Sequence, residues 1–137
     1  MLSRLRSVGA VVAGFIAATI VMMIVEWTNG HVVYPDLGKA AQGVMDREVL
    51  RGLLASAPVG ALLVVILGWI LGSLVGGWVT ARLAAQAGIT HGLVLGALLT
   101  LAGIANNVGI PPPTWFWIAS IAVLMPAAYW GARWAAR

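Results

Sequence analysis

The chain has 137 residues, of which 61% are hydrophobic and 9% are charged, and it contains no cysteine. A soluble domain carries about 25% charged residues, so this composition excludes an ordinary soluble fold, and the length allows a single domain over residues 1–137. The net charge of +4 comes from basic residues at the ends of apolar runs, as in membrane proteins, so we expect the lipid bilayer and not nucleic acid as a partner.

Arg4 and Arg6 precede an apolar run that reaches Val25, which predicts a first membrane-spanning helix over residues 7–28. A secretory signal peptide has the same basic-then-apolar order. The run is longer than the roughly 7–15 residues of a signal core, and no small-residue cleavage site follows it, so we expect a retained span. Asn29 and Gly30 tolerate the left-handed conformation that closes helices, so they predict its end.

Residues 29–57 form the one sizeable polar segment. Tyr34 to Gly38 predicts a turn. Asp46 is predicted to be a helix N-cap with Glu48 in the first turn, and an apolar face follows at Leu50, Leu53, Leu54 and Ala57. This pattern predicts a short amphipathic interfacial helix that lies on the membrane or caps the bundle, with partner docking as the alternative.

A second span is predicted over residues 58–84, because no charge occurs between Arg51 and Arg82. Gly68, Gly72 and Gly76 recur every fourth residue and therefore share one helix face. Such a groove lets another helix approach closely in lipid. The first span offers a matching stripe of small residues, at Ala10, Gly14 and Ala18.

The third span, over residues 91–109, repeats the small face at Gly92 and Gly96. Three consecutive prolines, at residues 111–113, then separate it from a fourth span over residues 114–134. Thr114 is predicted to be the N-cap of that helix, and Pro126 is expected to kink it near Ala122. The expected fold is therefore an all-α integral membrane protein with four transmembrane helices.

The distribution of Lys and Arg predicts the orientation. With four spans, the termini and the connection between the second and third spans share one side, which holds Arg4, Arg6, Arg82, Arg133 and Arg137. The other side holds Lys39, Arg47 and Arg51 together with Asp36, Asp46 and Glu48. Both termini are therefore expected to be cytoplasmic.

Polar residues gather at the predicted outer mouth of the bundle. The set comprises Glu26, His31, Asn106, Asn107 and Trp115. A carboxylate near the hydrocarbon is a functional candidate unless it is solvated or paired. Two interpretations of Glu26 stay open. In the first, its carboxylate reaches headgroup water or pairs with Lys39, Arg47 or Arg51. In the second, it belongs to a site for an ion, a proton or a ligand. Asn106 and Asn107 can equally be helix C-terminal caps. Trp69 falls near mid-membrane, where we expect it to pack between helices or face lipid.

Neither a cofactor nor a metal site is expected. His31 and His91 fall at opposite membrane faces, which argues against a shared metal ion or haem. Ser56, Ser73 and Ser120 have no predicted histidine neighbour, so we expect no catalytic residues and no enzyme.

Three segments resemble a family of small four-span bacterial inner-membrane proteins without an assigned activity. They are Gly-Ser-Leu-Val-Gly-Gly-Trp-Val-Thr-Ala-Arg-Leu-Ala at residues 72–84, the residues from Glu26 to Pro35, and the stretch from Gly103 to Trp117. The resemblance covers most of the chain and implies a multi-pass protein of the bacterial inner membrane. In size, span count and first-span carboxylate the chain also resembles small multidrug exporters, although its polar connection after the first span is longer.

The sequence is compatible with two alternative functions. The first is an accessory, assembly or scaffold subunit that acts through helix packing, with other membrane subunits or a second copy as partner, because small-residue stripes are abundant. The alternative is a small proton-coupled transporter or channel that uses Glu26, His31 and Asn107 at the outer mouth.

Overall fold

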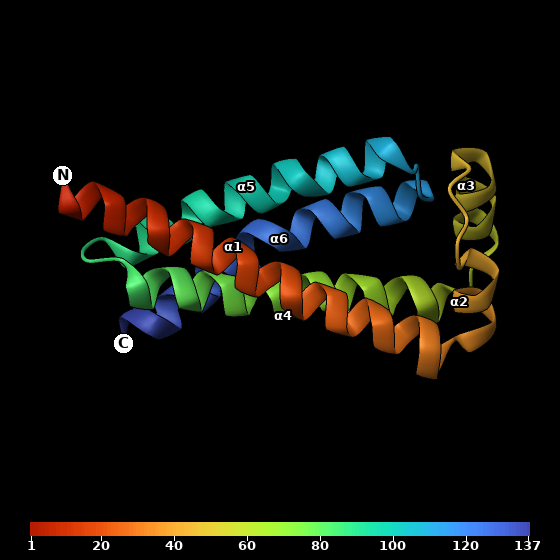
Figure 1. The fold of residues 1–137 in the computed structure, drawn as a ribbon, viewed down its shortest axis with the longest axis horizontal. Coiled ribbons are helices and arrows are strands. Elements are labelled where there is room, and N and C mark those ends of the chain that lie inside the picture. Colours follow the sequence, from red (N-terminus) through yellow and green to blue (C-terminus); the bar gives the residue numbers. More distant parts are fainter.

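The computed structural model describes residues 1–137 as an all-α protein (Figure 1). In chain order its elements are α1 (Leu2–Thr28), the π-helical turn η1 (Asn29–Val33), α2 (Pro35–Ala41), α3 (Arg47–Ser56), α4 (Val59–Leu83), α5 (Gly88–Gly109) and α6 (Thr114–Ala136). Four segments are long and apolar enough to cross a membrane, namely Leu2–Val33, α4, α5 and α6. The predicted fold, with four spans and short helical structure between the first and second, is confirmed.

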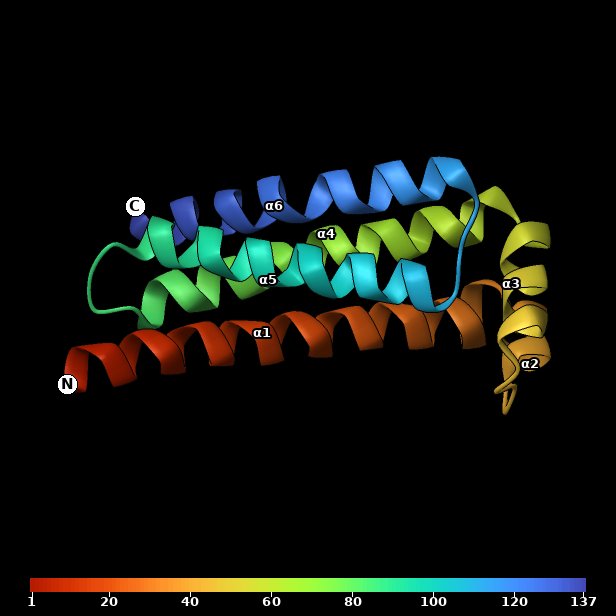
Figure 2. The same ribbon diagram turned by 90° about the horizontal axis from the view of Figure 1, so that it is seen from above.

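Helix α4 is the centre of the bundle. It packs along α1 on one side and along α6 on another, while α5 packs against α6 and α4 and has little contact with α1. Both termini and the α4–α5 loop lie at one end, which we call the terminal end (Figures 1 and 2). Helices α2 and α3 lie across the opposite end, so the basic residues divide between the two ends as the sequence predicts.

The predicted glycine groove of α4 is occupied by α1. A Cβ atom added at Gly72 would lie 2.8 Å from the carbonyl oxygen of Ala18, and one added at Gly76 would lie 2.8 Å from that of Gly14. Ordinary Cβ contacts begin near 3.4 Å, so only glycine permits this approach of the two backbones. Close approach maximises dispersion contacts, which drive helix association in lipid. The predicted match between the two small-residue faces is confirmed.

Further glycines serve the other interfaces. A Cβ at Gly77 of α4 would collide with the Ala128 carbonyl of α6, and one at Gly131 of α6 would collide with the Leu74 carbonyl of α4. Between α5 and α6, Gly92 lies against Ala132, and Gly96 lies against Met125 and Ala128. Every glycine predicted to pack helices therefore does so within this single chain.

The α-helix of the first span ends at Thr28, as predicted, but Asn29 and Gly30 do not close it in a left-handed conformation. Asn29 has right-handed helical dihedrals (φ −58°, ψ −47°), and the chain stays helical through η1 until Tyr34 (φ −130°, ψ 66°). The Asn29 side chain does not close its own helix, because its Nδ2 donates a hydrogen bond to the Ala61 carbonyl of α4 over 3.0 Å. The helix ends where Pro35 disfavours a helical conformation in the residue before it. Glu26 consequently lies inside the helical span and not at its end.

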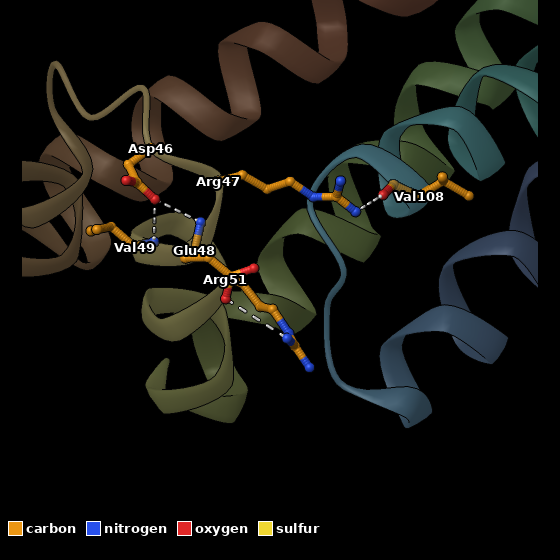
Figure 3. A network of polar contacts seen from close by, with 6 residues as sticks. All are labelled: Asp46, Arg47, Glu48, Val49, Arg51 and Val108. Atoms are coloured by element: carbon orange, nitrogen blue, oxygen red, sulfur yellow. Dashed lines mark hydrogen bonds and ion pairs between the residues drawn. The ribbon is translucent and has the colours of Figure 1, made fainter.

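The polar connection is more helical than predicted. The expected turn at Tyr34–Gly38 is instead the start of α2, with Pro35 at its first position, where a missing N–H has no cost. The Asp46 cap is confirmed, since its Oδ1 accepts hydrogen bonds from the backbone N–H of Glu48 (2.8 Å) and Val49 (3.2 Å) (Figure 3).

Helix α3 caps the bundle. Its residue Leu54 and the following Ala57 pack against a buried apolar cluster of α4 and α6, formed by Leu62, Ile66 and Phe116. Arg47 at its start donates from Nη2 to the Val108 carbonyl in the last turn of α5, over 2.8 Å (Figure 3). Carbonyls in the last turn of a helix have no intrahelical partner, so this bond fixes α3 to the end of α5.

Helix α6 differs in one detail from the prediction. Thr114 is its first helical residue and not its N-cap, because the Pro113 carbonyl already accepts hydrogen bonds from the N–H groups of Phe116 and Trp117. The helix continues through Pro126 to Ala136.

Candidate functional site

The five residues predicted to form one polar cluster do not share a single site. Glu26 and Asn106 line the same cleft. Asn107 is fully buried, His31 lines a different cavity, and Trp115 packs edge-on against Phe116 with 6.0 Å between ring centroids. The candidate site is therefore the cleft that contains Glu26 and Asn106.

This cleft has a volume of about 210 Å³ and lies where α1 and α5 face each other over the centre of the bundle. All four spans contribute side chains to it. They are Phe15, Thr19, Met22, Met23 and Glu26 from α1, Trp69 from α4, Leu99, Ala102, Gly103 and Asn106 from α5, and Leu124 from α6. Its wall is thus mostly apolar, with a carboxylate and an amide as the outstanding polar groups.

Glu26 has no basic partner. The one ion pair in the structure joins Arg51 to Glu48 over 3.9 Å at the protein surface (Figure 3). Arg47 binds the Val108 carbonyl, and Lys39 lines the separate cavity beside α2. The structure therefore does not show the pairing of Glu26 with Lys39, Arg47 or Arg51, which the sequence left open beside contact with headgroup water.

Trp69 lines the same cleft as Glu26. It is 6% exposed and belongs to the main apolar cluster, with Leu95, Leu99 and Leu124. Its ring meets Phe116 edge-on, with centroids 6.0 Å apart. Packing on several sides therefore holds the indole in place in the wall of the cleft. The expectation that Trp69 packs between helices is confirmed.

Asn106 and Asn107 have different roles although they are adjacent. Asn106 is exposed to the cleft and its side chain makes no hydrogen bond within the chain. Asn107 faces α6, where its Nδ2 donates to the Ser120 hydroxyl over 3.1 Å, and its Oδ1 has no partner. Neither is a C-terminal cap, because α5 ends at Gly109 with Ile110 as the capping residue. Asn107 therefore belongs to the α5–α6 interface and not to the cleft.

His31 is held by its own helix. Its ring stacks on Trp27 with centroids 4.5 Å apart, and its Nδ1 lies 2.9 Å from the Trp27 carbonyl oxygen. The cavity that it lines, with Lys39 and Gln42, is centred on α2. The structure contains no group of three His, Asp or Glu side chains that could hold a metal ion. His31 thus lies outside the Glu26 cleft.

Trp69 and Thr19 are the functional candidates that sequence reasoning missed. Both lie in apolar runs without a polar neighbour in sequence, so no local pattern marks them. The available signal was the position of Trp69 directly after Gly68 of the groove, which places a large aromatic ring beside a helix contact.

Comparison with family models, curated proteins and solved structures finds no match to this chain. The fold and the cleft nevertheless define its class. It is a small multi-pass membrane protein of four packed helices.

Proposed function

We propose that this protein binds small, largely apolar cations in the cleft between α1 and α5, with Glu26 as the counter-charge. The observation that carries the proposal is a carboxylate within a membrane span, without an ion-pair partner, in a cleft with a mostly apolar lining. An ionisable residue in a membrane span is costly and typically marks an ion or substrate pathway.

The shape of the cleft limits the ligand. Its volume of about 210 Å³ is smaller than the 300–1,000 Å³ typical of sites for drug-sized molecules, which favours a small amine. The Trp69 ring can contribute a cation–π attraction, and Asn106 offers a free amide for hydrogen bonding. A ligand with one cationic group and a short apolar body would match both the carboxylate and the apolar wall.

The distribution of the arginines indicates how the chain is oriented in the membrane. We place both termini on the cytoplasmic side of a bacterial inner membrane, because Arg4, Arg6, Arg82, Arg133 and Arg137 lie at the terminal end. The Glu26 end of the cleft is then near the outer face. A single carboxylate can hold either a proton or a cation, so binding of one displaces the other. That competition supports proton-coupled transport of the cation and does not require catalysis.

Equilibrium dialysis of benzylamine against the purified protein in phosphatidylcholine nanodiscs tests the proposal. We expect saturable binding of benzylamine and none of the neutral benzyl alcohol, which has a similar shape. The variant Glu26→Gln should reduce affinity by about tenfold or more, which corresponds to about 1.4 kcal/mol. The control Glu48→Gln removes an exposed carboxylate at the same end of the bundle and should leave affinity unchanged. Equal affinity in Glu26→Gln and the original protein would refute the proposal.

An accessory or scaffold role is the second candidate. Its sequence support was the surplus of small-residue rows, and these rows are occupied within the chain. A partner would need another surface, and the structure offers an apolar groove between α4 and α6. It is lined by Ile70, Leu74, Val123, Pro126, Trp130 and Trp134, among others. Crosslinking from this groove in intact membranes would test this role, and a strictly monomeric protein without partners would count against it.

A further inference from the structure

Another polar cavity lies at the terminal end, at the opposite end of α1 from Glu26. It has a volume of about 630 Å³ and is formed by the start of α1, the α4–α5 loop and the first turn of α5. Its side chains include Ser3, Arg4, Ser7, Val8, Gln86 and His91. Hydroxyl, amide, imidazole and guanidinium groups thus line one space beside the start of α1.

Arg4 is unengaged within the chain, unlike most arginines at this end. Arg6 donates from Nε to the Leu83 carbonyl over 2.9 Å, Arg82 lies over the Trp78 ring, and Arg133 lies over the Trp130 ring. Arg4 makes no hydrogen bond, ion pair or aromatic contact, and it lines the cavity. Its five N–H donors are therefore free for a ligand.

The other polar groups of the cavity are also available. The side chains of Ser3, Ser7 and Gln86 make no hydrogen bond within the chain. His91 uses Nδ1, which lies 2.9 Å from the Ala87 carbonyl oxygen, so its Nε2 remains free to meet a ligand. These are the group types that bind phosphate oxygens.

The charge around the cavity is of one sign. The four acidic side chains of the protein are Glu26, Asp36, Asp46 and Glu48, which belong to the far part of α1 and to the α2–α3 region. No acidic side chain lies at the terminal end, where five arginines gather. The local field therefore favours an anion.

We propose that this cavity binds the phosphate headgroup of an anionic phospholipid. Basic pockets between membrane helices on the cytoplasmic side are suited to such headgroups. The lipid, and not a soluble phosphate ester, is the favoured source, because the cavity lies beside the start of an apolar span and includes the exposed Val8. The acyl chains would continue along α1, while Arg4 would bind the phosphate.

Native mass spectrometry of the detergent-purified protein tests this proposal with dioleoyl-phosphatidylglycerol as probe. Arg4→Gln should reduce the apparent affinity for one bound lipid by about fivefold, the effect expected of one arginine near an anionic headgroup. Arg137→Gln is the matched control, because it removes an equal charge at the same end but outside the cavity, and it should retain most of the affinity. Circular dichroism would verify that both variants fold.

Two further probes separate the sources of binding. Dioleoyl-phosphatidylcholine should bind more weakly than phosphatidylglycerol, and glycerol 3-phosphate should not compete with the lipid at millimolar concentration. Equal losses in Arg4→Gln and Arg137→Gln would show a diffuse charge effect and overturn the site. Equal binding of the two lipids would also overturn it, and full competition by glycerol 3-phosphate would overturn the lipid as the ligand.

Discussion

Gly14 of α1 and Gly76 of α4 bring two membrane spans into backbone contact: a Cβ atom at Gly76 would lie 2.8 Å from the Gly14 carbonyl oxygen. The contact leaves no space for a side chain on either helix, since a Cβ at Gly14 would lie 2.6 Å from the Gly76 carbonyl oxygen. The same face of α4 carries Gly72, so α1 and α4 meet along a continuous seam. This seam positions Glu26 of α1 beside Trp69 of α4.

Substitution in the seam should separate the helices. We expect Gly76→Val to destabilise the protein by about 1–3 kcal/mol, the usual cost of overpacking a filled interior. Gly9→Val on α1 is the control, because a Cβ there meets nothing within 4 Å. Reversible unfolding in mixed micelles with increasing dodecyl sulfate measures the difference. Similar stability of the two variants would contradict the backbone contact.

Asn107 and Ser120 should be coupled energetically. Their hydrogen bond of 3.1 Å joins α5 to α6 in the buried interior. Double-mutant cycles for such bonds in membrane proteins average about 0.6 kcal/mol and reach about 1.7. We expect a coupling in this range for Asn107→Ala with Ser120→Ala in the same unfolding assay. A coupling of zero would show that the bond adds nothing to stability.

Substitution of Asn106, unlike that of Asn107, should affect ligand binding and leave the stability of the fold nearly unchanged. Its side chain lies in the cleft and makes no hydrogen bond within the chain, so Asn106→Ala should leave stability within about 0.5 kcal/mol. It should weaken benzylamine binding, because the ligand loses a polar neighbour. Parallel unfolding and dialysis measurements check this. A large loss of stability would show that Asn106 belongs to the packed interior.

Arg47 should hold α3 against the bundle. Its side chain bonds the Val108 carbonyl, whereas Arg51 makes only the long surface contact with Glu48. Arg47→Gln should therefore speed amide hydrogen exchange in α3 and in the last turn of α5. Arg51→Gln, which removes the same charge from the same helix, should leave exchange nearly unchanged. Equal exchange in the two variants would show that the Arg47 bond is not populated in solution.

The absence of cysteine makes topology directly testable. Single-cysteine variants can be labelled in whole cells with a reagent that does not cross the inner membrane. We expect labelling of Ala40→Cys in α2 and none of Ala136→Cys at the end of α6, given cytoplasmic termini. The reverse pattern would invert the orientation and place the Glu26 end of the cleft at the cytoplasmic face.

Local patterns predicted the spans, the groove and the Asp46 cap, because each depends on neighbours within a few residues or one helical turn. The helical turn η1, which continues the first span beyond α1, depends on more distant partners. Asn29 continues the helix since its side chain is used by the Ala61 carbonyl of α4, which no local pattern reveals. The same limit applies to Gly77 and Gly131, whose partners lie on other helices and follow no fourfold spacing.

The residues predicted to form one polar cluster do not come together, and the reason is geometric. Consecutive residues of a helix point about 100° apart, so Asn106 and Asn107 cannot face the same site. The predicted topology shows at which end of the bundle a polar residue lies. It does not show how each helix is rotated about its own axis, and this rotation decides which side chains face the same cleft. Of the predicted set, only Glu26 and Asn106 share a cleft.

The central position of α4 also bears on biosynthesis. Its partner α1 leaves the ribosome first, so those two helices can associate before α5 and α6 have been made. Helix α5 has its main partner in α6, the last to be synthesised. Assembly would therefore proceed as two successive helix pairs, and the recess beside Glu26 would come into existence only when the second pair docks on the first.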